Sequence, residues 1–481
     1  MKRLKEFVSE KAGFYGNLWL IAPVVIWFSY WPNWHFGQDS TMNFEISLPI
    51  ALLLVMGLAS VSSIVKNRQS LAENHLVWLI AALVGYTCLT IIWSVNPLRS
   101  LLTAGIAGLI GLVAIGVIAE GEKLRRLLPK IVNIYLVSAL VMSGLAIIQF
   151  IAGIWLPQSV TLLCDGCVAQ QFGFPRPNVF AIEPQFFGNM LLVSILIVAH
   201  RILSGTAKVR LFDLGDSFAL MLFAMLLTMS RGAIYALVVG LVVLVIVHRK
   251  KFRKVGLLVG LSLITLVASL GAQGFASMLN PTISETFMGA VSKSINQLTL
   301  GVVNITTKNK NEKETLKTSP EVIVESENQP QEIKLEPNYD GYVEESTTAR
   351  TSRSGMALEV WQKNLQTMLF GVGIGGAGVA MHQGFPDQIG AREIVQNEFV
   401  ERLLERGVIG LGLSLAVLGY VFYLTRHKKW LWAIIIALLL QLNFYSGYPN
   451  AVHVYLTLIL MAICSRSGFD FASAKSLGKH D

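Results

Sequence analysis

The chain has 481 residues, of which 53% are hydrophobic and only 14% are charged, and its formal net charge is +9. This composition lies outside the range of soluble globular proteins and predicts an integral membrane protein. In such proteins positive charge collects on cytoplasmic loops that face anionic lipid. No basic stretch is interleaved with aromatic residues as nucleic-acid binding requires, so the sequence argues against a nucleic-acid partner and leaves membrane lipids as the expected surroundings.

Apolar runs divide the chain into about twelve expected transmembrane helices, because a bilayer core of about 30 Å needs roughly twenty apolar residues per helix. The runs cover residues 17–33, 46–65, 75–93, 100–119, 130–153, 178–200, 215–229, 232–248, 255–274, 399–425, 430–446 and 450–464. We therefore predict an all-α polytopic membrane protein. Its expected parts are nine helices in 1–274, an extracytoplasmic loop domain in 275–397, three helices in 398–466 and a cytoplasmic tail in 467–481.

Basic residues are distributed unevenly between the two sides of this predicted bundle. Lys and Arg recur on the segments that share a side with the N-terminus, whereas the short loops of the other side hold only Arg99, Arg176 and Arg231. Because Lys and Arg favour cytoplasmic loops, both termini are predicted to be cytoplasmic and the long loop extracytoplasmic.

Arg231 stands in TMSRGA, between two apolar runs with almost no loop between them. A basic residue on the side opposite to the cytoplasmic bias carries a cost that the chain could otherwise avoid. One interpretation is an arginine whose stem lies along the membrane interface with its charged end in water. The other is a guanidinium that binds a lipid phosphate through two parallel hydrogen bonds. The sequence leaves both open.

The long loop has two parts of different composition. Residues 308–348 are rich in Glu, Lys, Asn and Pro, which predicts a disordered insertion without a catalytic role. An amphipathic stretch then places apolar residues at helical spacing, namely Met356, Val360, Trp361, Leu365, Met368 and Leu369. The following GVGIGGAG lacks the preceding strand, the spacing and the lysine of a nucleotide-binding loop. Its glycines are expected to form a tight turn that folds the loop back onto the membrane helices.

Charged and polar side chains on the outer face form a candidate site. Arginines that face a carboxylate-bearing cavity suit a diphosphate leaving group, while a base or an amide positions an acceptor hydroxyl. The candidates for diphosphate binding are Arg231, Arg353, Arg350 and Arg176. The catalytic candidates are Gln396, Glu393, Glu398, His382 and Glu183.

Simpler interpretations exist for several of these charges. At the start of the tenth predicted helix, charges at helical spacing can pair within the helix and stabilise its first turns, and they are Glu401, Arg402, Glu405 and Arg406. Glu183 can be a membrane-edge carboxylate paired with Arg176 rather than a functional group. A simple pairing explains Arg353 less well, because no acidic residue is close to it in the sequence before Glu359.

Several segments together resemble the O-antigen ligase and polymerase superfamily of bacterial membrane glycosyltransferases. They are SRGA after the seventh predicted helix, SG followed by LEVW before a helix that ends in LFGVGIGG, and QNEFVERLLERGVIGL. The segment RPNVFAIEPQFFGN is similar to the polymerase branch. The resemblance implies a GT-C-like transferase in the bacterial cytoplasmic (inner) membrane that needs no metal or cofactor. It would take a glycan from undecaprenyl diphosphate and join it to a hydroxyl of a glycan or lipid acceptor.

The same resemblance implies roles for individual residues. Arg231 would bind the diphosphate, and Arg353 would stand near the loop arginine of the family. Gln396 occupies the place of a histidine that engages the acceptor in the ligase pattern. Glutamine can orient a hydroxyl but cannot accept a proton at neutral pH. Either another group, such as Glu393, Glu398, Glu183 or His382, would then serve as the base, or little help from a base is needed because the diphosphate leaves early. The departure favours a polymerase or a divergent transferase over a lipid A-core ligase.

Two other classes of function stay open. About twelve helices with both ends inside also describe secondary transporters and flippases of lipid-linked glycans. Against this class, the long insertion follows the ninth predicted helix instead of separating two halves, and no repeat of two halves is visible in the sequence. The third class, a membrane protein without catalysis, is compatible with Gln396.

Overall fold

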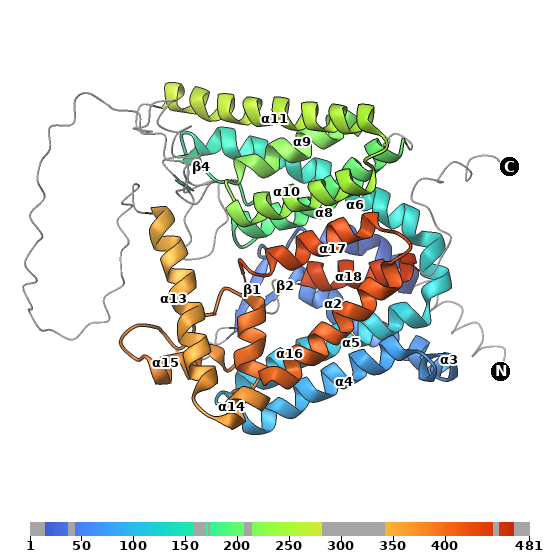
Figure 1. Ribbon diagram of the computed structural model, residues 1–481, viewed down its shortest axis with the longest axis vertical. Helices are drawn as coiled ribbons and strands as arrows, with labels where there is room; N and C mark the ends of the chain where they lie inside the picture. The colour runs from blue at the N-terminus through green and yellow to red at the C-terminus, as the bar shows by residue number, and fades with distance from the viewer. Residues whose placement is uncertain are drawn as a thin grey trace, which may run out of the picture.

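The computed structural model describes residues 15–36, 44–156, 170–171, 174–205, 214–280, 342–445 and 452–465. Most of these residues lie in helices that run side by side as a bundle, with a smaller group of helices at one end of it (Figure 1). The helices are Tyr15–Val25, α2 (Leu48–Lys66), α3 (Arg68–Ala72), α4 (His75–Leu89), η1 (Thr90–Trp93), α5 (Pro97–Ala119), α6 (Gly121–Gly153), α8 (Pro184–Ser204), α9 (Leu214–Leu227), α10 (Arg231–Val247), α11 (Phe252–Leu279), α13 (Tyr342–Gln362), α14 (Leu365–Phe370), α15 (Ala377–Gly384), α16 (Glu398–Thr425), α17 (Trp430–Gln441) and α18 (Val452–Ser465).

Every apolar run that the sequence predicts as a transmembrane helix coincides with one of these helices. Among the described residues, seven helices are long and apolar enough to cross a membrane, namely α2, α4 with η1, α5, α6, α8, α11 and α16. Shorter apolar helices account for the rest of the bundle. Several helix ends differ from the predicted bounds: the first helix ends at Val25 instead of residue 33, α6 begins at Gly121 instead of residue 130, α8 begins at Pro184 instead of residue 178, and α17 ends at Gln441 instead of residue 446.

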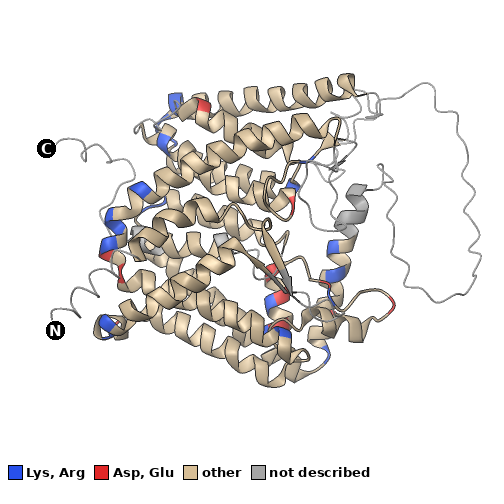
Figure 2. Ribbon diagram, turned by 180° about the vertical axis from the view of Figure 1, so that it is seen from behind, with Lys and Arg blue, Asp and Glu red and all other residues tan. Residues whose placement is uncertain are grey.

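The outer surface of the bundle is apolar, as expected for helices that face lipid tails. On α11 the side chains of Leu263, Ile264 and Val267 are each more than half exposed. Exposed apolar surface of this extent is unusual on a soluble monomer but is what a bilayer solvates. Lys and Arg gather toward the ends of the bundle, and its long middle stretches carry few charges (Figure 2). The structure thus agrees with a multi-pass membrane protein.

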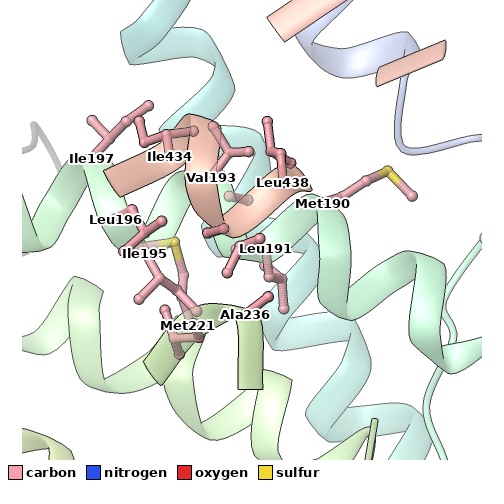
Figure 3. Packing of buried hydrophobic residues seen from close by; sticks show 14 of the residues in the cluster. Met190, Leu191, Val193, Ile195, Leu196, Ile197, Met221, Ala236, Ile434 and Leu438 are labelled. Atoms are coloured by element: carbon pink, nitrogen blue, oxygen red, sulfur yellow. The ribbon is translucent and has the colours of Figure 1, made fainter. Parts of the chain in front are cut away.

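Helix α8 forms the centre of the bundle. Its sequence is apolar on all sides, which predicts a helix buried all round, and its most apolar stretch of 18 residues is fully buried. Figure 3 shows its side chains packed against α9 at Met221, α10 at Ala236, and α17 at Ile434 and Leu438. The middle of α8 is therefore packed against three neighbouring helices.

The long loop departs from the prediction in two places. Helix α13 begins at Tyr342, inside the segment predicted to be disordered, and residues 308–341 of that segment lie outside the described residues. The amphipathic stretch is not one helix, because α13 ends at Gln362 and α14 begins at Leu365. The break has a local cause: Asn364 caps α14 by accepting a hydrogen bond of 2.8 Å from the backbone N–H of Thr367, whose hydroxyl accepts from the backbone N–H of Asn364.

The all-α prediction also missed two short antiparallel strand pairs. Strand β1 (Asn33–Phe36) pairs with β2 (Phe44–Ser47), and β3 (Gln170–Gln171) pairs with β4 (Phe174–Pro175). In Figures 1 and 2 the β1–β2 hairpin lies toward the end of the bundle that carries α13. The chain just before β1 is tied to the turn before α8, since the backbone N–H groups of Tyr30 and Trp31 donate to the carbonyl of Phe180 at 3.0 and 3.3 Å.

Candidate functional site

Three helices begin at one place, around the turn that follows α17. The backbone N–H of Glu398, at the start of α16, donates to the carbonyl of Leu442 at 2.9 Å. The Gln185 amide, at the start of α8, donates to the carbonyl of Phe444 at 3.0 Å. At the start of α10, Gly232 lies so close to Phe444 that an added Cβ would be 2.8 Å from its ring. We call the first turns of α8, α10 and α16 with residues 442–445 the helix junction. Helix N-termini carry partial positive charge, so the junction favours an anion.

Backbone strain is concentrated in the turns that lead into these same three helices. Among the described residues, the non-glycine residues with positive φ are Val179 (55°), Met229 (50°) and Gln396 (60°). Val179 precedes α8, Met229 precedes α10 and Gln396 precedes α16. For a β-branched residue such as valine this conformation is a genuine outlier. Strained residues persist only where the surroundings enforce them, and they cluster at functional sites.

Two side chains hold the strained turns in place. The Gln149 side chain, from α6, accepts hydrogen bonds from the backbone N–H groups of Asn178 (3.0 Å) and Val179 (2.8 Å). The Arg176 Nε donates to the carbonyl of Thr228 at 3.1 Å and so joins the turn before α8 to the turn before α10. Arg176 thereby has a positioning contact at the junction.

Arg231 is the first residue of α10 and lies within the helix junction. A cation at this end of a helix opposes the helix dipole, which disfavours it by about 0.3–1 kcal/mol. Arg231 also closely follows the strained Met229. One turn further along α10, the ring of Tyr235 stacks with Phe444 at a centroid distance of 6.5 Å. An opposing helix dipole and a strained turn therefore coincide at Arg231, which suits a residue kept for binding an anion.

Arg350 connects α13 to the junction. Its Nε donates to the side-chain oxygen of Gln396 at 3.3 Å, and its Nη2 donates to the side-chain oxygen of Gln185 at 3.2 Å. Gln185 in turn donates to the carbonyl of Phe444. A continuous chain of contacts thus runs from Gln396 through Arg350 and Gln185 to the segment that covers the first turn of α10.

Two other predicted residues lie in the loop domain and are engaged there. Arg353 pairs with Glu393 at 2.9 Å, so the arginine without a nearby acidic residue in the sequence has one in space. The Nδ1 of His382, on α15, lies 2.7 Å from the carbonyl of Ile389 and donates to it, which leaves Nε2 as the acceptor of the neutral ring. These contacts bind α13 and α15 to the segment that follows α15.

Glu398 is enclosed within the protein, with 2% of its surface exposed. Its Oε1 accepts hydrogen bonds of 2.7 Å from both the Arg402 Nε and the Tyr455 hydroxyl. The expected pairing within the helix therefore exists, but it joins Arg402 to Glu398. Glu401 and Glu405 instead accept backbone N–H groups of the loop, from Val395 at 3.1 Å and from Gly375 at 2.7 Å.

The glycine-rich turn folds back onto the membrane helices, as the sequence predicts. Gly371, Gly373 and Gly375 all have positive φ. The backbone N–H groups of Val372 and Gly373 donate to the carbonyls of Leu404 and Glu405, each at 2.9 Å. This contact fixes the loop domain to α16 one helical turn or two beyond the junction.

Gly407 provides a test of this contact. It breaks the helical path of α16 with φ 61° and ψ −170°, and an added Cβ would collide with the backbone carbonyl of Leu369. We expect Gly407→Ala to lower the free energy of unfolding by about 1–3 kcal/mol or more, because it adds strain to a backbone contact. Thermal unfolding of the purified protein in detergent measures the effect. Gly412→Ala, where the added Cβ meets no atom within 4 Å, is the control, and equal unfolding temperatures for the two variants would contradict the contact.

Sequence reasoning missed several residues of the junction. Gln185 and Asn189 lie on one face of α8, and the Asn189 amide donates to the Tyr445 hydroxyl at 2.7 Å. A signal for them was present, since two amides four residues apart in the mostly apolar first half of a helix need buried partners. Within the described ranges, no three His, Cys, Asp or Glu side chains are grouped as metal ligands would be.

One family model matches part of the chain. The family model described as O-antigen ligase matches residues 217–415. The match contains Arg231, Arg350 and Gln396, while Arg176 and Gln185 precede it. No curated protein matches the chain. The matched segment joins the turn before α10 to the loop domain and α16, and over these residues the similarity supports the O-antigen ligase and polymerase superfamily.

Proposed function

We propose that this protein transfers or polymerises a glycan from undecaprenyl diphosphate onto an acceptor hydroxyl at the extracytoplasmic face of the bacterial cytoplasmic membrane. Its O-antigen ligase domain indicates a role in cell-surface glycan biosynthesis. The proposal adds the donor, the type of acceptor and the side of the membrane. In this orientation both termini are cytoplasmic, about twelve helices cross the membrane, and the helix junction opens toward α13–α15.

The observation that carries the proposal is the coincidence of strain, helix ends and arginine at the helix junction. The three left-handed non-glycine turns of the described chain lead into the three helices that begin there. Their N-termini favour a multiply charged anion. Arg231 and Arg350 add permanent positive charge, and guanidinium groups bind phosphate oxygens through paired hydrogen bonds. A diphosphate that gains charge as it leaves matches this arrangement.

On the acceptor side, we assign orientation to Gln396 and proton removal to Glu183. Glu183 is the residue directly before α8, and it is two residues from Gln185, which belongs to the helix junction. Of the other candidates, Glu398 is buried beside Arg402 and Tyr455, and Glu393 lies in the loop domain beside Arg353. His382 lies on α15 in the loop domain.

The proposed step is a single displacement at the anomeric carbon of the donor sugar. The acceptor hydroxyl oxygen forms a bond to this carbon as the bond from the carbon to the diphosphate oxygen breaks. The hydroxyl proton passes to the Glu183 carboxylate, and undecaprenyl diphosphate leaves with the bonding electrons. Arg231 and Arg350 stabilise the charge that develops on the leaving group.

A turnover assay tests the proposal. Purified protein in lipid vesicles is given undecaprenyl-diphosphate-linked glycan from the native host, and glycan length is followed by gel and mass spectrometry. We expect longer glycan and free undecaprenyl diphosphate. Glu183→Gln, which keeps the size of the side chain but removes the base, should slow turnover by about 10²–10⁴-fold with donor binding retained.

The same vesicles distinguish the transporter class from the transferase. Glycan that stays unconsumed while wild-type protein moves it between the two leaflets would replace the proposal with a flippase. Full activity of Glu183→Gln would be compatible with a transferase but would show that Glu183 is not its base. A variant of an exposed carboxylate at a distance, Glu122→Gln, is the control for charge and expression, because its side chain is 78% exposed and paired only with its helical neighbour Arg126.

A further inference from the structure

Three aromatic rings stack against the turn that leads into α8. The Phe28 and Phe180 rings lie 4.8 Å apart with an interplanar angle of 18°. The Trp31 and Phe180 rings lie 5.8 Å apart at 22°. Phe180 contacts both other rings in near-parallel fashion, so the three form a ring stack, the name used below for Phe28, Phe180 and Trp31. Trp31 is 49% exposed, and aromatic surface of this kind is available for a further flat partner.

The ring stack is attached to the helix junction by the backbone. The Phe180 carbonyl accepts the N–H groups of Tyr30 and Trp31. Phe180 directly follows Val179, whose strained conformation is held by the side chain of Gln149. Only two residues separate Phe180 from Glu183, the proposed base. The same enforced turn therefore presents an aromatic surface and a catalytic carboxylate.

We infer that the exposed ring of Trp31 binds a pyranose ring of the glycan substrate. A pyranose offers C–H groups on its faces and hydroxyls at its edge, so that it stacks on an aromatic ring while the hydroxyls remain hydrogen-bonded. Sites for such ligands combine aromatic surface with a few fixed polar groups, and the junction supplies the polar groups. This inference rests on the proposed function and adds the part of the protein that holds the sugar.

The occupant is a sugar rather than a lipid tail or headgroup for a structural reason. A tryptophan that anchors a protein at the membrane interface needs only its own amphipathic ring at headgroup depth. Trp31 is instead stacked on Phe180 and hydrogen-bonded through its backbone to the strained turn. Fixed orientation is of use for aligning a sugar with the reacting carbon, because misplacement of a substrate by about 1 Å slows reaction strongly.

Binding measurements on the full chain in lipid nanodiscs test the inference. The probe is delipidated glycan, released by mild acid from the lipid-linked pool of the host and titrated with detection by saturation-transfer NMR. We expect Trp31→Ala to weaken this binding by about tenfold, the loss of one aromatic contact, and Trp31→Phe to retain most of it. Trp155→Ala is the matched control, since Trp155 is 55% exposed and follows the end of α6. In turnover, Trp31→Ala should raise KM for the glycan far more than it lowers kcat.

Other outcomes overturn the inference. Equal glycan affinity in wild type and Trp31→Ala excludes the stacking contact, as does a wild type that does not bind the glycan at all. If Trp31→Ala loses as much affinity for sugar-free undecaprenyl diphosphate as for glycan, Trp31 anchors the protein at the membrane interface and does not bind the sugar. Trp31→Phe and thermal unfolding separate lost binding from lost folding. If Trp31→Ala abolishes glycan binding while wild type turns over no donor, the sugar site at Trp31 is supported and the proposed transferase activity is rejected.

Discussion

Arg231→Ala is expected to reduce turnover of lipid-linked glycan by about 10²–10³-fold, the usual effect of removing one donor that stabilises a developing oxyanion. The fold should remain intact, because the substitution removes a cation from the positive end of α10 and is favourable by about 0.3–1 kcal/mol for that helix. Loss of activity without loss of stability is what distinguishes a residue retained for an anion from one retained for folding.

The measurement is kcat in vesicles, taken together with the unfolding temperature of each variant. Arg231→Lys keeps the charge but loses the planar pair of donors, so an intermediate rate is expected. Arg126→Ala is the control, since Arg126 is 79% exposed and forms only a helical surface pair. If Arg231→Ala is as active as Arg126→Ala, the guanidinium is an interfacial group and the diphosphate binds elsewhere.

The helices could be predicted from the sequence because each apolar run carries its own signal. A helix that crosses the bilayer core needs about twenty apolar residues, whatever it packs against. The glycine-rich turn was also predictable, since Gly371, Gly373 and Gly375 permit a backbone conformation that other residues avoid. These features are determined by residues that are close together in the sequence.

The helix junction could not be predicted in the same way, because its contacts join residues far apart in the chain. The hydrogen bonds of Arg350 reach Gln185 and Gln396, which are 165 and 46 residues away. Strain at Val179 depends on Gln149, on another helix. Glu398 carried a signal for function, a carboxylate at a membrane helix end, but its burial beside Arg402 and Tyr455 depends on tertiary packing that the sequence does not reveal.

Arg402→Met is expected to lower the free energy of unfolding by about 3–5 kcal/mol, the effect of leaving a buried charge without its partner. Arg402 is 6% exposed and Glu398 is 2% exposed, so water cannot replace the lost contact. The Tyr455 hydroxyl would remain as a hydrogen-bond donor to Glu398, but a neutral donor does not replace the direct ion pair. Denaturant titration of the purified protein in detergent measures the loss.

The double variant Glu398→Gln with Arg402→Met decides what the pair is for. Both charges are then absent, and the glutamine oxygen still accepts from Tyr455, so most of the lost stability should return. Because the proposed base is Glu183, the loss of the carboxylate at residue 398 should leave the activity per folded molecule near that of wild type. A stable but inactive double variant would instead make Glu398 the base, and the pair with Arg402 would then serve to keep that carboxylate charged.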